Sequence, residues 1–179
     1  MTRKILAVAA LLLVAGFTSQ QLSAQGGPPQ GQPGGSAPPR PPQTIDLATA
    51  KKMAAAAEAA AIALNGHVAI VVMDSNFDVV YVERMDTASP RAVTSSIGHA
   101  RAALVFGISD IQAYDAMKAG KPISVMLTAP PQGNLEITIE PGGIPIMKDG
   151  KIIGAIGVGG IASLNDEKVA QAGIDALGK

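Results

Sequence analysis

The 179-residue sequence contains no cysteine and no tryptophan, and its only aromatic residues are two tyrosines and three phenylalanines. The absence of cysteine excludes a disulfide framework, a thiolate zinc site, an iron–sulfur cluster and a cysteine nucleophile. Five aromatic rings are too few for the stacking platforms with which proteins bind single-stranded nucleic acid. Because 14 basic and 14 acidic side chains cancel, no basic surface indicates a nucleic-acid partner.

The first 24 residues have the features of an export signal. Arg3 and Lys4 precede an apolar run over residues 5–17, and the small Ala24 offers a cleavage point before Gln25. The alternative is a membrane anchor, but the run is shorter than the ~20 apolar residues that a spanning helix needs. We therefore expect residues 1–24 to be a signal peptide and the mature protein to be periplasmic or secreted.

Residues 25–43 differ in composition from everything around them. Seven prolines and five glycines occupy most of this segment, which leaves almost no apolar surface to bury. We expect a disordered Pro/Gly/Gln-rich linker, followed by one domain over residues 44–179. That domain has 14 acidic and 11 basic side chains. Since no disulfide can stabilise it, packing alone, or packing together with contacts between subunits, must do so, and this is a first indication of a homo-oligomer.

The domain shows helix and strand signals in an α-β-β-α-α-β-β-β-α order. Asp46 can cap an Ala-rich helix that ends at Asn65-Gly66, and Asn165 or Ser163 can cap the last one. Runs rich in Val and Ile predict a strand hairpin, and Asp149-Gly150 predicts another. The expected elements are helices over 46–64, 91–106, 110–119 and 165–177, and strands over 68–74, 79–85, 135–139, 144–148 and 151–158. Strands in hairpins predict an α+β domain with one antiparallel sheet.

A glycine cluster over residues 154–160 suggests a phosphate-binding loop, but it lacks the Gly-Lys-Ser/Thr ending and lies mostly within a strand. Glycine there more often permits close approach of two backbones, so no nucleotide cofactor is expected. One alternative stays open. Gly159 and Gly160 precede a helix, and free N–H groups at such a turn can bind a carboxylate or a propionate.

The sequence has only two histidines, so one subunit cannot build a multi-histidine metal cage. His67 precedes a strand and is expected at the surface. His99 lies in the second helix, where it is a structural residue, a general base or an iron ligand. Arg84 and Asp86 lie two residues apart at a strand end, so they can point the same way and bind a small acid or a neighbouring subunit.

Several stretches resemble the GlcG/HbpS family, which includes the C-terminal-type domain of PduO proteins. The resemblance covers essentially all of residues 44–179 in family order, and its most specific part is the string Gly-Gly-Ile-Pro-Ile, Asp-Gly, Ile-Gly-Ala-Ile-Gly-Val. The matching residues are 71–74, 84–86, 100–106, 142–146, 149–150, 153–158, 166–167 and 170–173. The resemblance implies a profilin-like fold with a five-stranded antiparallel sheet, flanking helices and a dimer or larger ring.

The resemblance also implies a ligand class. Exported HbpS-type members bind haem and respond to redox state, sometimes with a sensor kinase, and PduO-type domains also bind haem. This sequence departs from the family at three positions. Phe77 replaces a usual turn glycine, Gly159 replaces a common serine, and His99 replaces a usual lysine. The last departure makes His99 our candidate iron ligand.

We therefore expect an exported, oligomeric protein that binds haem or a related tetrapyrrole in a redox-sensing, storage or accessory role, with a possible sensor or membrane partner. His99 is the candidate metal ligand. Arg84 or Arg101 would pair with propionates, and the remaining candidates are Asp86, Gly159 and Gly160. One alternative is a small enzyme or accessory subunit that uses Arg84, Asp86, Glu140 and His99 on an organic acid. Another is a ligand-free assembly module.

Overall fold

The computed structural model describes residues 42–125 and 135–178. Within these ranges the chain forms α1 (Leu47–Ala63), β1 (Ala69–Asp74), β2 (Val79–Arg84), α2 (Ala92–Phe106), α3 (Asp110–Lys118), β3 (Gly143–Lys148), β4 (Lys151–Gly159) and α4 (Ser163–Asp175). The α+β class is confirmed. The expected signal peptide and nearly all of the expected linker lie outside the described residues. Over the described ranges, no helix has both the length and the hydropathy required to cross a membrane.

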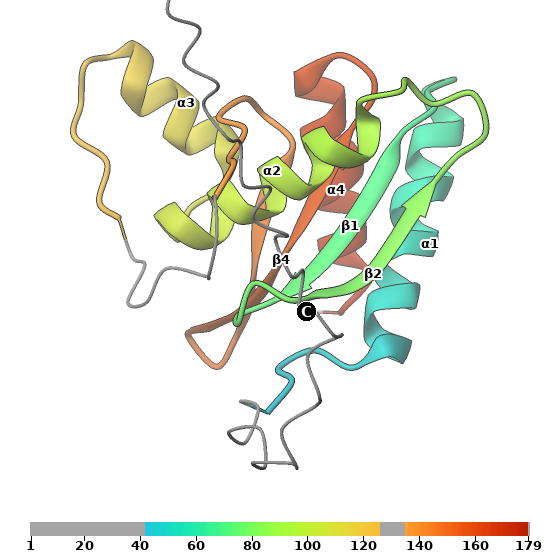
Figure 1. Cartoon of the computed structure of the whole chain (residues 1–179), viewed down its shortest axis with the longest axis horizontal. Helices are drawn as coiled ribbons and strands as arrows, with labels where there is room; N and C mark the ends of the chain where they lie inside the picture. The colour runs from blue at the N-terminus through green and yellow to red at the C-terminus, as the bar shows by residue number, and fades with distance from the viewer. Residues whose placement is uncertain (1–41, 126–134, 179) are drawn as a thin grey trace, which may run out of the picture. The chain divides into compact units, whose positions relative to one another are not determined.

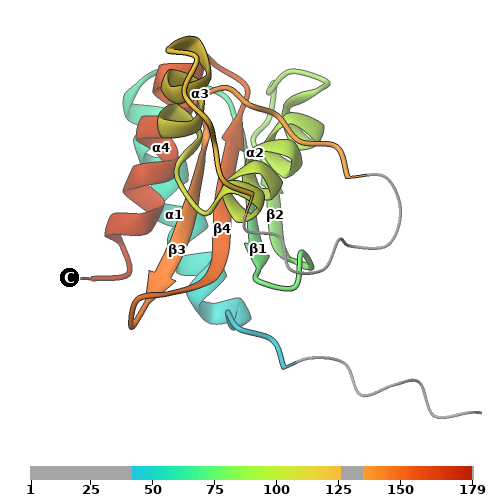
Figure 2. The same cartoon turned by 90° about the vertical axis from the view of Figure 1, so that its left-hand side faces the viewer.

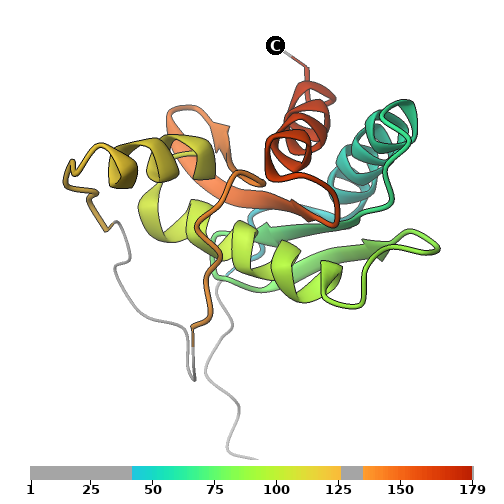
Figure 3. The same ribbon diagram turned by 90° about the horizontal axis from the view of Figure 1, so that it is seen from above.

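The four strands form one antiparallel sheet in the order β2-β1-β4-β3 (Figure 1). Helices α1 and α4 cover one face of this sheet and α2 crosses the other, which is clearest from above (Figure 3). Helix α3 follows α2 and contacts α4 and β3 (Figure 2). The sheet therefore lies between two helical layers.

Strand β1 is central, and all six of its residues are buried. This explains its unbroken apolar run, because a strand covered on both faces has no solvent side on which polar residues would alternate. Ile70 and Ile156 pack with Met53 and Val169 of α1 and α4. On the opposite face the sheet packs against α2, where the cluster is Val71, Met73, Ala100, Ala103, Leu104 and Ala155.

The glycine cluster allows α2 to lie directly on β4. A Cβ atom on Gly157 would lie only 2.6 Å from the main-chain nitrogen of Ala100, which is far inside van der Waals contact. Gly159 similarly faces Ser95, at 3.0 Å from its Cβ. The expectation that these glycines permit close backbone approach is confirmed, and the small side chains of α2 serve the same purpose.

Most predicted helix ends and turns are confirmed. Asp46 Oδ1 accepts a hydrogen bond from the Thr49 N–H at 2.7 Å and caps α1. Gly107 ends α2 with a left-handed φ of 67°. Asp149 and Gly150 both have positive φ, as a two-residue hairpin turn of type I′ requires.

The predicted caps of α4 were wrong. The capping position is Ala162, three residues before Asn165 and one before Ser163, so both predicted caps already lie inside the helix. Asp166 Oδ1 accepts a hydrogen bond from the Ile161 N–H at 3.3 Å. A carboxylate inside the first turn therefore satisfies a donor before the helix, so an N-cap side chain is not needed.

The expected strand over residues 135–139 is also wrong, and with it the five-stranded count over the described residues. Residues 135–140 are irregular and cross α2 instead of joining the sheet. Thr138 packs directly on Gly98 of α2, with its main-chain nitrogen 3.0 Å from where a Cβ of Gly98 would lie. Because this segment lies on the outer side of α2, no strand edge is within reach for pairing.

Candidate functional site

A groove of about 760 Å³ opens between the first half of α2, residues 136–140 and the start of α4. Both helices contribute their N-terminal turns. The lining side chains include Arg91 and Ser95 of α2, with His99 one turn further along. Gly160 and Asp166 line the opposite wall. The volume lies within the ~300–1,000 Å³ of typical small-molecule and cofactor sites.

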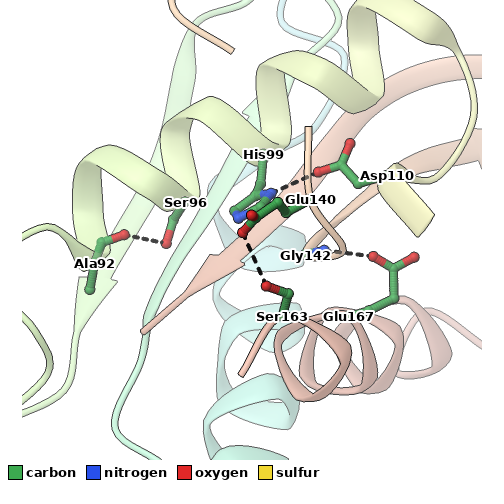
Figure 4. Close-up of polar contacts among 8 residues, drawn as sticks. All are labelled: Ala92, Ser96, His99, Asp110, Glu140, Gly142, Ser163 and Glu167. Carbon is green, nitrogen blue, oxygen red and sulfur yellow. Dashed lines mark hydrogen bonds and ion pairs between the residues drawn. The ribbon is translucent and has the colours of Figure 1, made fainter. Parts of the chain in front are cut away.

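His99 is held from α3 by Asp110. The His99 Nδ1 and Asp110 Oδ2 atoms are 2.8 Å apart (Figure 4), and the two side chains are 3% and 0% exposed. Asp110 is the first residue of α3, which begins with Ser109 at the capping position. The Ser109 N–H donates to Gln112 Oε1 at 3.1 Å, and this closed first turn fixes where the Asp110 carboxyl lies.

Burial shifts the pKa values of the two members of this pair in opposite directions. Loss of hydration disfavours both charged forms, so it lowers the pKa of His99 to about 4 and raises the pKa of Asp110 to about 10, a rise to which the charge of nearby Glu167 adds. Both shifts favour the neutral forms of the imidazole and the carboxyl group, which share the hydrogen bond between Nδ1 and Oδ2. The other carboxyl oxygen, Asp110 Oδ1, is buried and has no partner among the described residues.

Glu140 lies on the other side of the His99 ring (Figure 4). Its carboxylate charge and a main-chain hydrogen bond from the imidazole both oppose the fall in the His99 pKa. Since Nδ1 already pairs with Asp110, Nε2 is the nitrogen that faces the Glu140 carbonyl. The Glu140 side chain in turn accepts a hydrogen bond from the Ser163 hydroxyl at 3.2 Å, which connects it to the start of α4.

Glu167 connects three parts of the chain behind His99. Its Oε2 accepts a hydrogen bond from the Gly142 N–H at 2.7 Å (Figure 4). Burial raises the pKa of Glu167, while hydrogen bonds from Gly142, Ser109 and Ile111 pull it back. This carboxyl of α4 thus binds both the first turn of α3 and the entry to β3, and it keeps Asp110 and Gly142 in place around the imidazole.

Asp166 belongs to the groove wall itself. It is buried, and burial raises its pKa to about 7, although hydrogen bonds from the N–H groups of Ile161 and Gly160 favour the charged form. The groove lining then contains the carboxyl groups of Glu136, Glu140 and Asp166 against the single guanidinium of Arg91. Its acidic side is the side of residues 136–140.

The structure brings together only part of the predicted site. His99 and Gly160 line the groove, and Gly159 lies beside it against Ser95. Arg101 is half-buried on α2, where its guanidinium contacts the Glu136 carbonyl at 3.5 Å and its Nε has no partner among the described residues.

The remaining predicted residues lie elsewhere. Arg84 donates to the Ala88 carbonyl and braces the loop after β2. Asp86 is exposed in that loop. Neither lines the groove. His67 is exposed, as expected.

Sequence reasoning missed the acidic partners of His99. Asp110 and Glu167 read as ordinary helix-start acids, because Asp and Glu are common in first turns. Their burial depends on two helices meeting behind α2, for which the sequence carries no local signal. Among the described residues, no group of three or more His, Asp and Glu side chains is arranged to hold a metal ion.

These features define an α+β domain with a groove between two helix N-termini and a buried histidine in its wall. Residues 45–175 match the family model described as "Haem degrading protein HbpS-like". The chain therefore belongs to the HbpS-like family, and the resemblance seen in the sequence is confirmed.

Two curated relatives agree with this assignment. The chain is 33% identical over 135 residues to an uncharacterized 15.0 kDa protein in the dhaT-dhaS intergenic region of Citrobacter freundii, which covers 75% of this chain and 92% of that protein. It is 35% identical over 94 residues to protein GlcG of Escherichia coli K12, covering 52% of this chain and 65% of GlcG.

Solved structures agree as well. Protein ORFY of Klebsiella pneumoniae matches with a TM-score of 0.65 at 28% identity, covering 79% of this chain and 95% of that one. A double mutant of HbpS from Streptomyces reticuli matches with a TM-score of 0.64 at 27% identity, covering 84% and 97%. A PduOC:heme complex shares the fold, with a TM-score of 0.63 at 20% identity over 74% and 94% of the two chains.

Proposed function

We propose that this chain is an exported, homo-oligomeric protein that binds haem or a related tetrapyrrole in the groove beside His99. The observation that carries the proposal is the groove itself, of about 760 Å³ with a buried imidazole in its wall, in a chain of the HbpS-like family. The haem complex of PduOC, which shares the fold, supports the ligand class. We further propose a redox-sensing, storage or accessory role alongside a sensor or membrane partner.

The residues fit such a ligand in part. The volume suits a macrocycle, Ile137 and Ile161 give apolar contact, and the Arg91 guanidinium can pair with a propionate. His99 can offer iron only Nε2, because Nδ1 is engaged by Asp110, and only once Nε2 no longer donates its proton to the Glu140 carbonyl. Among the described residues, no phenylalanine or tyrosine lines the groove, and its carboxyl groups oppose an anionic ligand. We therefore expect weak or exchangeable binding, with iron supplying redox chemistry once bound.

Titration of the mature protein with hemin tests this function. We expect a shifted Soret band that saturates, a similar titration for His67→Ala, and at least tenfold weaker binding for His99→Ala. The histidine pair is a matched control, because the sequence has only these two. No shift in the wild-type protein would refute haem binding. Identical titrations of His99→Ala and wild type would refute ligation by His99.

Export and assembly have separate tests. We expect cell fractionation to place the protein outside the cytoplasm, and N-terminal sequencing of the mature protein to begin at Gln25. Light scattering coupled to size-exclusion chromatography would show a mass of two or more subunits. A cytoplasmic protein that retains Met1 would contradict export, and a monomer would contradict assembly.

A second candidate function is an enzyme or accessory subunit that acts on a small organic acid. The observation that favours it is the Asp110–His99 pair beside Glu140, since an imidazole oriented by a carboxyl group is a common general base. Turnover of an organic acid without added haem, abolished in His99→Ala, would support this alternative. A ligand-free assembly module is favoured instead if the protein binds neither hemin nor an acid.

A further inference from the structure

Residues 135–140 form a strap over the groove face of α2. The Glu136 carbonyl lies 3.5 Å from the Arg101 guanidinium, Thr138 packs on Gly98, and Glu140 faces His99 (Figure 4). These contacts all lie within one turn of the helix, at residues 98–101, so the strap crosses α2 and covers the imidazole. It is fixed to α4 by the Ser163–Glu140 hydrogen bond of 3.2 Å.

The two sides of the His99 ring are held very differently. On the Nδ1 side, Asp110 is fully buried and belongs to a helix whose first turn is bound by Glu167. On the Nε2 side, the strap is irregular, its residues are half-buried or exposed, and no strand pairs with it. Segments with few buried contacts and no hydrogen-bond ladder open locally at the lowest free-energy cost.

We propose that the strap is a displaceable cover that occupies the Nε2 side of His99, and that an iron-bearing or other electrophilic ligand reaches this nitrogen only when the strap moves away from α2. The identity of the ligand rests on the proposed function. That the strap covers His99 rests only on the contacts described above. It explains how a groove-lining histidine is only 3% exposed. The strap thereby sets how fast, and how tightly, the groove accepts its ligand.

Gly98 is the point at which the strap can be pushed away. A Cβ atom there would collide with the Thr138 side chain and lie 3.0 Å from the Thr138 main-chain nitrogen. Alanine is a better helix former than glycine, so Gly98→Ala strengthens α2 while it displaces the strap. Shortening the opposing residue in the double variant Gly98→Ala with Thr138→Ala relieves the collision with the Thr138 hydroxyl.

The first experiment needs no haem. Diethyl pyrocarbonate modifies accessible imidazole nitrogens, and mass spectrometry of the full chain separates the only two histidines. Exposed His67 serves as the internal standard for reagent activity. We expect His99 in the wild-type protein to react at least tenfold more slowly than His67, and Gly98→Ala to raise the His99 rate severalfold. The double variant should return toward the wild-type rate.

Two further variants provide an independent test of the cover and a control. Ser163→Ala removes the hydrogen bond between α4 and the strap at a helix position that tolerates alanine, so it tests the cover even if Gly98→Ala fails to fold. Gln171→Ala removes another side-chain hydrogen bond of α4, the one to Asp175, outside the groove, and should leave His99 protected. The proposal is overturned if His99 reacts as fast as His67 in the wild type. It is also overturned if folded Gly98→Ala and Ser163→Ala both leave the His99 rate unchanged.

The second experiment connects the cover to the ligand. Stopped-flow mixing with hemin should show severalfold faster association for Gly98→Ala and Ser163→Ala than for wild type and Gln171→Ala, with the gain lost when His99→Ala is added. If no variant binds hemin, the proposed ligand is wrong. The modification rates of His99 still show whether the strap covers it. If hemin binds equally fast to all variants, the cover does not control the groove and the proposal fails.

Discussion

His99 and Asp110 face each other across the α2–α3 corner, with Nδ1 and Oδ2 2.8 Å apart and both side chains cut off from solvent. A buried hydrogen bond of this kind costs little when both partners are present and much when one is removed. The pair therefore has two structural roles. It fixes the orientation of the only groove-lining imidazole, and it holds the first turn of α3 against α2.

The first prediction concerns this pair. Asp110→Ala should lower the free energy of unfolding by about 3 kcal/mol, because it leaves a buried imidazole without a partner and opens a small cavity. Asp110→Asn retains a hydrogen-bonding group of the same size and should cost about 1 kcal/mol. Urea denaturation at pH 7 measures both. Equal costs for the two variants would show that the hydrogen bond does not stabilise the fold.

The second prediction concerns pH. The folded pKa of Asp166 is raised to about 7 by burial, so between its ordinary value near 4 and about 7 the folded protein binds a proton that the unfolded chain has released. The stability that this group contributes is present below that window and is lost as pH rises through it, by at most about 1.4 kcal/mol per pH unit. The raised pKa values of Asp110 and Glu167 act in the same direction.

Asp166→Asn isolates the contribution of Asp166, because the amide oxygen can still accept from the Ile161 N–H. We expect the variant to lose less stability than the wild type between pH 4 and pH 8. Thermal unfolding followed by circular dichroism across this range measures the difference. Parallel pH profiles for the two proteins would contradict a raised pKa at this position.

The third prediction concerns the contact between α2 and β4. In Gly157→Ala the new methyl group would lie 2.6 Å from the Ala100 nitrogen, on a helix backbone that cannot turn aside, so we expect a cost of about 3 kcal/mol. Gly66→Ala is the matched control. Its Cβ would meet the end of the Ile161 side chain at 2.9 Å, which can rotate, so this change should cost under about 1 kcal/mol. Chemical denaturation compares them, and similar costs would mean that the sheet yields easily under α2.

The fourth prediction concerns the first hairpin turn. Phe77 has a left-handed φ of 66°, while its side chain packs against the hydrophobic cluster that includes Val71 and Met73. Both Phe77→Ala and Phe77→Gly lose that packing, but only glycine avoids the left-handed penalty of about 1 kcal/mol. We therefore expect Phe77→Gly to unfold at a higher temperature than Phe77→Ala, although alanine is usually the more stable of the two. The opposite order would show that the turn relaxes out of this conformation.

The sequence predicted the local elements well where a chemical signal lies within a few residues. Asp46 before an Ala-rich run, Gly107 after an apolar helix and the Asp149-Gly150 turn each specify their own backbone, and the structure confirms all three. For the glycine cluster over residues 154–160, the missing Gly-Lys-Ser/Thr ending was enough to favour close backbone packing over a phosphate-binding loop. The segment 135–139 was predicted wrongly because its β-branched residues satisfy the strand pattern, whereas its packing partner is a helix.

The functional site was likewise predicted only in part from the sequence. The sequence alone identified His99 as the residue to test, because it contains only two histidines and the other, His67, comes just before a strand and is expected at the surface. The absence of cysteine also left only nitrogen, oxygen and methionine sulfur as possible ligands for iron. What the tertiary structure decided is which groups surround that imidazole. Asp110, Glu140 and Glu167 lie on three segments up to about 70 residues after His99 in the sequence. They meet at the imidazole only because α3, the strap and α4 converge around His99 in the folded chain. Burial there removes the solvation of charged groups, so the fold, not the residue types, determines that His99 is neutral, paired and covered.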